Sequence, residues 1–230
     1  VAKVKKTAAK KIKVTGVKPG TAKVTVKVTY KTSTKKNAKA KTKKLTYTLK
    51  VAKVGVALSG DSVVAVGSTT KLTNTKKNSS RAKITYTSSD DTIAKVDAAT
   101  GVVTGVKAGK ATITAKITVG KDSATTTKDV EVKNHVLSTV AQNKLTELTA
   151  TVTGDTKNLK ATDFAIKSEA TNVVYPVSKV TVDSKDASKV TLTLFSELKD
   201  AATYDVTLDG ITKTFVASDG KVASIALDKA

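Results

Sequence analysis

The lysine-rich stretch at residues 31–44 is the first place in this sequence where side chains could do chemistry. It holds seven lysines and no acidic, aromatic or arginine residue. Clustered ammonium groups attract any polyanion in a salt-sensitive way, whereas nucleic-acid recognition normally adds aromatic platforms or arginine forks. We therefore predict contacts with anionic polymers or with acidic surface on a neighbouring copy, and no nucleic acid; a merely solvated loop is the alternative. The lysines are Lys31, Lys35, Lys36, Lys39, Lys41, Lys43 and Lys44.

The single histidine, His135, is the next candidate for chemistry. General-base or metal-ligand roles need partner residues, and the chain has no second histidine and no cysteine. The missing cysteines also exclude disulfides and thiol catalysis. No serine lies in a nucleophile elbow. We predict that the chain is not an enzyme, that it has no catalytic residue, and that His135 has a linker or surface role.

Two small groups of acidic residues could be considered for calcium. Asp90 and Asp91 lie near Asp97, and Asp183 lies near Asp186. Calcium takes six to eight oxygen ligands, often from several carboxylates of one loop, and neither group has that density. We predict turn carboxylates and no cofactor, with calcium as the alternative.

The elements that carry these residues are predicted to be strands. Valine, isoleucine, leucine, alanine and threonine dominate, and aromatic residues make up 3%, a composition that favours pleated, half-buried strands. In residues 111–117, apolar residues alternate with threonine or lysine, so one face is apolar. The sequence predicts an all-β protein, with residues 31–44 as a long connection between strands at 21–30 and 45–51.

An internal repeat organises the first part of the chain. Residues 14–25 match residues 103–114, and residues 1–4 match residues 93–96, at offsets of 89 to 92. Residues 1–53 would then be the C-terminal half of a copy, and residues 54–134 a complete copy. The half copy lacks pairing strands; we favour upstream residues lost from the chain over a strand donated by another chain.

This repeated unit resembles the bacterial immunoglobulin-like domain of group 2. The resemblance rests on Ile84-Thr85-Tyr86-Thr87-Ser88-Ser89-Asp90, Ile93-Ala94-Lys95-Val96, Gly101-Val102-Val103-Thr104-Gly105-Val106-Lys107-Ala108-Gly109 and Ala111-Thr112-Ile113-Thr114. The family usually has tryptophan where Tyr86 stands. The resemblance implies tandem β-sandwiches but says little about function.

Residues 135–218 form a different unit. Asp209-Gly210 lies between two alternating runs, 204–208 and 211–215, and this pair favours a type I′ turn because both residues need positive φ. The pattern is similar to the immunoglobulin-like domains of Gram-positive surface-layer proteins. Residues 219–230 are predicted to start a further strand or domain. We expect seven-stranded sandwiches at 55–133 and 135–218, with Tyr86, Tyr204, Phe195 and Phe215 in their cores.

Charge is distributed unevenly along the chain. Residues 1–54 hold 18 lysines and no acid, whereas residues 135–230 hold 11 basic and 12 acidic residues. With the resemblances, this implies a structural, self-assembling component of a bacterial cell surface or cell wall, a surface-layer fragment. The expected partners are copies of itself and anionic cell-wall polymers, and no apolar run is long enough to span a membrane. An adhesin stalk, or a spacer in a secreted wall enzyme, is the alternative.

Overall fold

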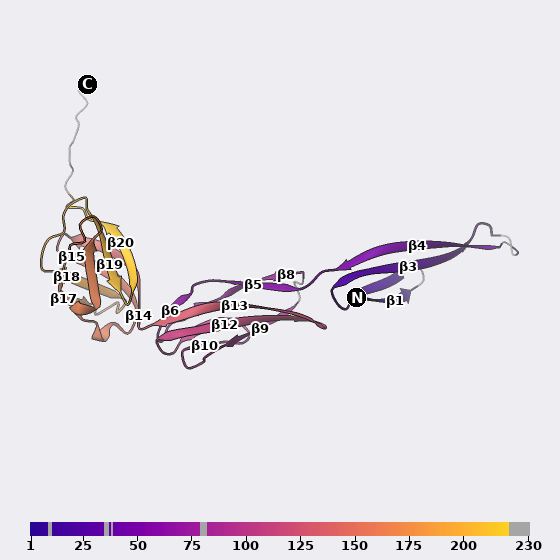
Figure 1. Ribbon diagram of the computed structural model, residues 1–230, viewed down its shortest axis with the longest axis horizontal. Coiled ribbons are helices and arrows are strands. Elements are labelled where there is room, and N and C mark those ends of the chain that lie inside the picture. Colours follow the sequence, from indigo (N-terminus) through magenta and orange to yellow (C-terminus); the bar gives the residue numbers. More distant parts are fainter. Residues whose placement is uncertain (9–10, 35–36, 38, 79–81, 221–230) are drawn as a thin grey trace, which may run out of the picture. The chain divides into compact units, whose positions relative to one another are not determined.

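The chain folds almost entirely into β-strands (Figure 1). The computed structural model describes residues 1–8, 11–34, 37, 39–78 and 82–220. Strands account for 65% and helix for 3%, which confirms the prediction of an all-β protein with immunoglobulin-like sandwiches. Within the described ranges the helical pieces are two three-residue 3-10 turns, η1 (Thr156–Asn158) and η2 (Ala161–Asp163), and no helix is long and apolar enough to cross a membrane.

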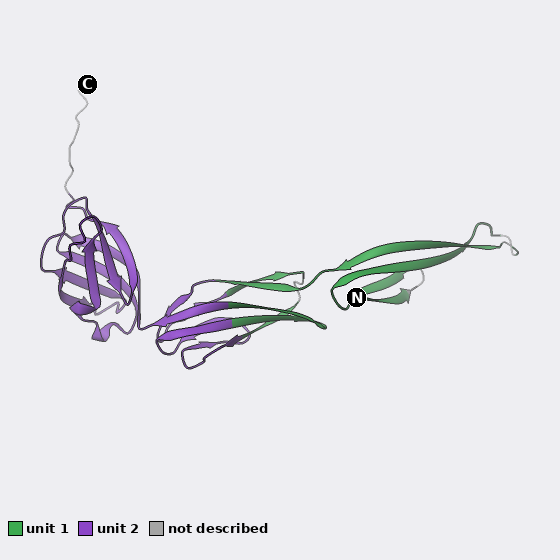
Figure 2. Ribbon diagram, viewed as in Figure 1, with its two compact units in different colours: residues 1–59, 73–86, 114–127 green, residues 60–72, 87–113, 128–230 purple. Residues whose placement is uncertain are grey.

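The first of two compact units comprises residues 1–59, 73–86 and 114–127 (Figure 2). It contains three two-stranded antiparallel sheets. These pair β1 (Ala2–Ala8) with β2 (Lys11–Gly16), β3 (Gly20–Lys31) with β4 (Ala40–Val51), and β5 (Gly55–Ser59) with β8 (Thr73–Lys77).

The β3–β4 hairpin is longer than the sequence led us to expect. Its pairing runs without interruption from Gly20↔Val51 to Lys31↔Ala40. Residues 40–44 therefore belong to β4, and their prediction as part of a connection is wrong. Threonine and lysine alternate with other residues through this segment, so the strand keeps one polar face and nothing in the sequence ends it.

The second unit comprises residues 60–72, 87–113 and the chain from 128 onward (Figure 2). It contains a three-stranded sheet in the order β10-β11-β7 and part of a four-stranded sheet in the order β6-β13-β12-β9, whose last three strands run through both units. The strands are β6 (Val63–Ala65), β7 (Thr69–Lys71), β9 (Lys83–Ser88), β10 (Ala94–Val96), β11 (Val102–Gly105), β12 (Gly109–Val119) and β13 (Asp122–Lys133). With β5 and β8, the described part of residues 55–133 has nine strands where seven were predicted.

The apolar face of the second unit is closely packed. Val103 on β11, Ile113 on β12 and Val130 on β13 are all 0% exposed. Gly105, the last residue of β11, packs against the backbone of β6. A Cβ added at Gly105 would lie only 2.5 Å from the carbonyl oxygen of Ala65. Only glycine allows that approach.

Residues 135–216 form a seven-stranded sandwich, as predicted. Its two sheets have the orders β14-β15-β18-β17 and β16-β19-β20. The strands are β14 (His135–Lys144), β15 (Glu147–Gly154), β16 (Phe164–Ser168), β17 (Val177–Val182), β18 (Lys189–Leu194), β19 (Thr203–Leu208) and β20 (Ile211–Val216). Tyr204 is fully buried in the core. Its hydroxyl accepts a hydrogen bond from Lys199 N–H (2.7 Å), and burial raises the pKa of this phenol.

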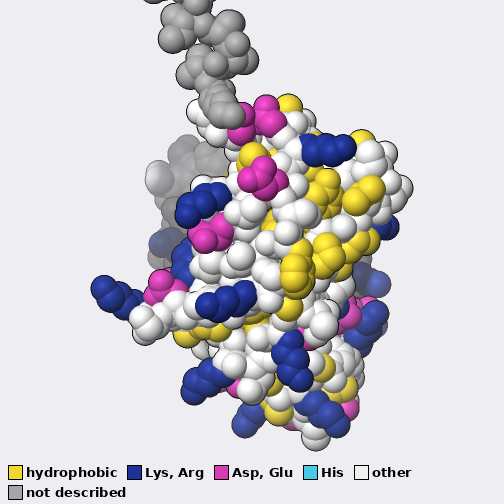
Figure 3. All heavy atoms as spheres, turned by 90° about the vertical axis from the view of Figure 1, so that its left-hand side faces the viewer, with side chains coloured by type: hydrophobic (Ala, Val, Ile, Leu, Met, Phe, Trp, Pro, Cys, Tyr) yellow, Lys and Arg dark blue, Asp and Glu magenta, His cyan; other side chains and the backbone are white. Residues whose placement is uncertain are grey.

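Three of the four aromatic residues predicted for the core are found there. Tyr86 and Tyr204 are buried, and Phe215 packs partly buried against the core. Phe195 is 75% exposed, so its assignment to the core is wrong: it follows the buried Leu194 directly and therefore lies on the outer side, with Thr191 and Thr193. Figure 3 shows hydrophobic side chains, in yellow, gathered on part of one face.

The turn between β19 and β20 has the predicted conformation. Asp209 and Gly210 both have positive φ, 48° and 73°, as a type I′ turn requires. The division of the chain at residues 53/54, 134/135 and 218/219 stays a prediction. Most of the predicted strand at 219–230 lies outside the described residues.

Candidate functional site

One face of the β3–β4 hairpin consists of lysine and threonine with a single alanine. Paired residues of an antiparallel sheet point to the same side, and successive residues alternate. The register therefore gathers, on one side, twelve residues that are all exposed. We call this the lysine–threonine face: Thr21, Lys23, Thr25, Lys27, Thr29 and Lys31 on β3, with Ala40, Thr42, Lys44, Thr46, Thr48 and Lys50 on β4.

Threonine pairs hold this face together between its charges. The hydroxyls of Thr25 and Thr46 lie 3.1 Å apart, and those of Thr29 and Thr42 lie 3.4 Å apart. Between these pairs Lys27 lies directly opposite Lys44. Like charges in that position destabilise a sheet, and a bound anion would relieve the repulsion.

The structure separates the lysines that the sequence grouped together. Lys31 and Lys44 lie on the lysine–threonine face, whereas Lys41 and Lys43 pair with Tyr30 and Val28 on the opposite face. Lys39 lies in the connection before β4. Lys35 and Lys36 lie outside the described residues, and the role of all seven in binding stays a prediction.

Three lysines of this face, Lys23, Lys27 and Lys50, were not predicted as contact residues from the sequence. They lie outside the lysine-rich stretch, and only period-two alternation along both strands could have identified them. Lys23, Lys27 and Lys31 recur at every fourth residue, which spaces them about 13 Å apart along an extended strand.

The corresponding face of β12 and β13 carries acids. There Thr112 Oγ1 donates to Asp129 Oδ1 (2.7 Å), and Lys133 pairs with Glu131 (3.3 Å). The N-terminal segment has no acidic residue through position 54. The same kind of sheet face thus carries both signs of charge on one pair of strands and only positive charge on the other.

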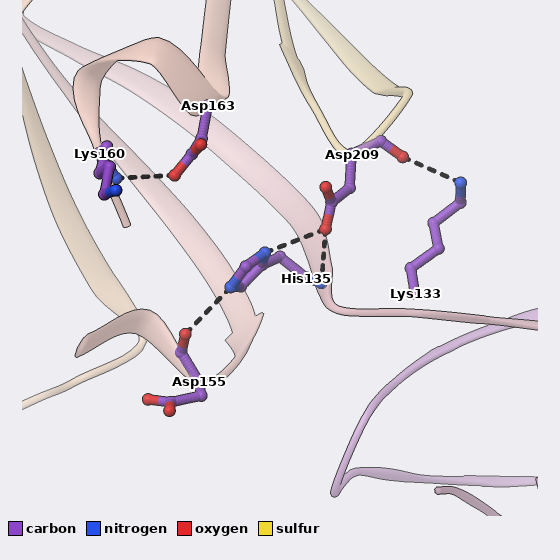
Figure 4. Close-up of polar contacts among 6 residues, drawn as sticks. All are labelled: Lys133, His135, Asp155, Lys160, Asp163 and Asp209. Carbon is purple, nitrogen blue, oxygen red and sulfur yellow. Dashed lines mark hydrogen bonds and ion pairs between the residues drawn. The ribbon is translucent and has the colours of Figure 1, made fainter. Parts of the chain in front are cut away.

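A second polar cluster lies where β13 passes into β14 (Figure 4). Asp209 Oδ2 accepts a hydrogen bond from His135 N–H (2.9 Å) and lies 3.0 Å from His135 Nδ1. His135 Nε2 lies 3.0 Å from the carbonyl oxygen of Asp155, which only accepts, so Nε2 donates. Lys133 Nζ donates to the carbonyl oxygen of Asp209 (2.9 Å).

This junction cluster ties the start of β14 to the β19–β20 turn and to the end of β15. Both ring nitrogens of His135 face acceptors, and an imidazolium would satisfy both of them. The ring therefore holds the start of β14 against the β19–β20 turn. The linker or surface role expected for His135 stays a prediction.

Four of the five acidic residues considered for calcium, all but Asp91, accept hydrogen bonds within turns. Hydrogen bonds from the Thr92 side chain and N–H lower the pKa of Asp90. Hydrogen bonds from Thr100 do the same for Asp97, and those from Ser188 for Asp186. In the part of the chain that the structure describes, no group of three or more histidine, aspartate or glutamate residues is placed to hold a metal.

Comparisons with known proteins give a family match for the central part of the chain. The family model of the bacterial Ig-like domain (group 2) matches residues 51–130, and no curated protein matches the chain in sequence. Among solved structures, domains 4 and 5 of the S-layer protein SbsC are 18% identical, with 71% of this chain and 96% of that chain covered and a TM-score of 0.30.

Two longer SbsC structures are also similar. Domains 1–6 are 22% identical, with 93% of this chain covered and a TM-score of 0.28, and SbsC 31–844 is 16% identical, with 90% covered and a TM-score of 0.30. The chain spans about a third of these two structures (31% and 37%). The sequence resemblance to the group 2 Ig-like family is confirmed over residues 51–130, which match that family's model.

Proposed function

We propose that this chain is a structural, non-enzymatic component of a bacterial cell surface: a surface-layer segment that assembles with copies of itself outside the cell. The group 2 Ig-like domain at residues 51–130 supports a bacterial structural module. In this proposal, residues 1–53 are the second half of a like domain, and residues 135–218 are a surface-layer-type Ig-like domain.

The observation that carries the proposal is the lysine–threonine face. It presents Lys23, Lys27, Lys31, Lys44 and Lys50 to solvent without an acidic residue. Residues 135–230, by contrast, hold 12 acidic against 11 basic residues. Neighbouring copies can therefore bring the cationic face of one against acidic side chains of another, and anionic wall polymers compete for the same face.

These charges set the register of contact and contribute little affinity each. Exposed ion pairs are worth about 0–1 kcal/mol, and complementary charge acts mainly on encounter rate and specificity. Because exposed charges are screened beyond about 8–10 Å at physiological ionic strength, assembly should weaken as salt rises.

The test compares two variants with equal loss of charge. K23Q/K27Q/K44Q removes lysines from the lysine–threonine face, and K39Q/K41Q/K43Q removes the same number from the connection and the opposite face. Wild type and both variants are imaged by electron microscopy and pelleted at low and high salt. We expect sheets or tubes at low salt for wild type and the second variant, and far fewer for the first.

The outcomes of this test distinguish the lysine–threonine face from net charge, and a surface layer from a stalk or spacer. Equal loss in both variants means that net charge matters and the face does not. Isolated particles at every salt concentration contradict the surface-layer proposal and favour the stalk or spacer. Pelleting with purified cell walls, in the same salt series, tests the wall-polymer partner separately.

A further inference from the structure

Two short connections carry the chain from one β-structure to the next. Residues 52–54 connect β4, which ends at Val51, with β5, which begins at Gly55, and Asn134 alone connects β13 with β14. We call residues 52–54 the first joint and residues 133–135 the second joint. The backbone of such a connection rotates about its φ and ψ angles unless further contacts restrict it.

The first joint contains a peptide group that is held on both sides. The N–H of Val54 donates to Asp122 Oδ2 (2.9 Å). The carbonyl oxygen of Lys53, which belongs to the same peptide group, accepts a hydrogen bond from Asn78 Nδ2 (2.5 Å). Asp122 is the first residue of β13, directly after the turn from β12. The aspartate therefore comes from the last pair of strands before the second joint.

The second joint repeats this arrangement with other residues (Figure 4). The N–H of His135 donates to Asp209 Oδ2 (2.9 Å), in the turn between β19 and β20. The carbonyl oxygen of the same peptide group, that of Asn134, lies so close to Gly154 that a Cβ there would overlap it. Lys133 Nζ donates to the carbonyl oxygen of Asp209 (2.9 Å), so the residues on both sides of Asn134 are bound to Asp209.

The two arrangements are independent of the internal repeat. Neither Asp122 nor Asp209 lies in the repeated residues, and residues 135–218 form a different unit. Each aspartate is far in sequence from the amide that it accepts from, 68 and 74 positions respectively. The same contact thus arises twice from different sequences, at the peptide group through which the chain enters the sandwich that follows.

Holding a peptide group on both sides limits the rotations that remain. The atoms of the group lie in one plane, so a bond to the N–H and a contact on the carbonyl fix that plane on the sandwich that follows. A carboxylate acceptor strengthens the hold, because charge-assisted hydrogen bonds are about twice as strong as neutral ones. Bending is then left to Ala52 and Lys53 in the first joint and to Asn134 in the second.

We propose that Asp122 and Asp209 are positioning residues of the two joints. Each carboxylate fixes the entering peptide group on its own sandwich and thereby confines the movement of that sandwich against the β-structure before it. The inference does not rest on surface-layer assembly, because it applies equally to a stalk or a spacer.

Distances between spin labels test this proposal. The chain has no cysteine, so introduced cysteines carry labels at the chosen positions only. Lys23→Cys with Lys116→Cys reports on the first joint, and Lys116→Cys with Thr181→Cys reports on the second; all three residues are exposed. Pulsed electron paramagnetic resonance on the full chain then gives the width of the distance distribution across each joint.

Each aspartate should affect only its own joint. Asp122→Ala removes the acceptor of Val54 N–H. Asp209→Gly removes the acceptor of His135 N–H and keeps a residue that allows positive φ in the turn. Loss of one hydrogen bond raises the share of molecules with a free joint about tenfold. We expect Asp122→Ala to broaden the first distribution alone, and Asp209→Gly to broaden the second alone.

Matched variants separate the contact from the loss of a charge. Asp129→Ala on β13 and Asp205→Ala on β19 each remove an aspartate that accepts a hydrogen bond from a threonine of the neighbouring strand. Both should leave the two distributions unchanged. Asp122→Asn and Asp209→Asn keep an oxygen acceptor and should broaden the distributions less than Asp122→Ala and Asp209→Gly do. If the amide spectrum of β15 and β18 shows that Asp209→Gly does not fold, Asp209→Asn provides the comparison.

Hydrogen exchange of the Val54 and His135 amides distinguishes a broken bond from a moving joint. Each amide should exchange about tenfold faster in the variant that removes its acceptor. Faster exchange with an unchanged distance distribution would overturn the proposal, because the bond would then exist without confining the joint. Unchanged exchange would overturn it as well, since the bond would contribute nothing in solution.

Two patterns of broadening would also contradict the proposal. If one variant broadens both distributions equally, the chain has loosened generally and the aspartate does not position its own joint. If Asp129→Ala or Asp205→Ala broadens a distribution as much as Asp122→Ala or Asp209→Gly, the charge of the chain and not the contact is responsible.

Discussion

Asp209 serves the β19–β20 turn and the start of β14 at the same time. Its backbone adopts positive φ, while its carboxylate contacts both the N–H and the ring of His135. The sequence identified the turn from Asp209-Gly210 alone. It could not identify the contact with His135, because the two residues are 74 positions apart and only the sandwich brings them together.

The His135 amide measures this contact directly. Asp209→Ala removes the acceptor of His135 N–H, and we expect hydrogen exchange of that amide to accelerate by about tenfold, the worth of one hydrogen bond. Asp209→Asn keeps an oxygen acceptor and a residue that tolerates positive φ, so its effect should be smaller. Equal exchange in wild type and both variants would mean that the contact contributes nothing in solution.

Turn carboxylates make part of the stability depend on pH. Hydrogen bonds from Thr100 lower the pKa of Asp97 in the folded chain below its ordinary 3.8. Stability from this group is therefore complete above that ordinary value and is lost as pH falls through the lower, folded pKa. Asp97→Asn should flatten the loss of stability below about pH 4, measured by denaturant unfolding from pH 2 to 6.

Asp91→Asn is the control for that measurement. Asp91 neighbours Asp90, is exposed, and has no side-chain hydrogen bond among the described residues. Its replacement should leave the acid limb unchanged. If Asp91→Asn and Asp97→Asn change the limb equally, general charge and not the turn is responsible.

At the scale of elements, the β3–β4 hairpin combines a cationic face with cross-strand repulsion. Lys44→Glu places an acid directly opposite Lys27 and should stabilise the hairpin by about 0.2–1 kcal/mol. Lys43→Glu makes the same charge change on the opposite face, beside Val28, and should not. Hydrogen exchange of the hairpin amides separates the two variants; a larger gain from Lys43→Glu would contradict the register.

Sequence pattern predicted strands well and their ends poorly. Alternation identified the strand that contains Ile113, because packing against a core enforces period two. It did not show that β4 begins at Ala40, since lysines on a strand exposed on both sides obey no hydrophobic pattern. Phe195 was placed in the core because it is aromatic, although alternation from the buried Leu194 puts it on the same side as Thr191 and Thr193.

The sequence predicted the cationic character of the candidate site but only some of its residues. Clustered lysines without acids pointed to polyanion or lattice contacts, and Lys31 and Lys44 do share a face. Lys41 and Lys43 were grouped with them because proximity in sequence ignores the alternation of a strand. The face on which a lysine of β4 lies depends on the pairing of β4 with β3. Nearly all of β3 lies outside the lysine-rich stretch, so the stretch alone could not show it.

Across the whole molecule, burial predicts unequal stability. The valines of β2 and β3 remain partly exposed, whereas Leu148, Leu192 and Tyr204 of the C-terminal sandwich are 0% exposed. Local opening draws on the least buried parts first. We expect amides of β1–β4 to exchange faster than those of β15 and β18, on the order of a hundredfold, given about 1.5–3 kcal/mol per buried side chain. Hydrogen exchange read by mass spectrometry tests this, and equal protection would contradict it.

The parallel pairing of β6 with β13 also bears on mechanical load. Tension along the chain reaches this domain from residues before β6 and leaves it after β13, through Lys133. Because the two strands are parallel, a pull on the start of one and the end of the other slides them past each other. The hydrogen bonds from Glu131 N–H to Ser62 O and from Val66 N–H to Lys133 O then bear force together and must break together, whereas a hairpin pulled at its open end loses its bonds one at a time.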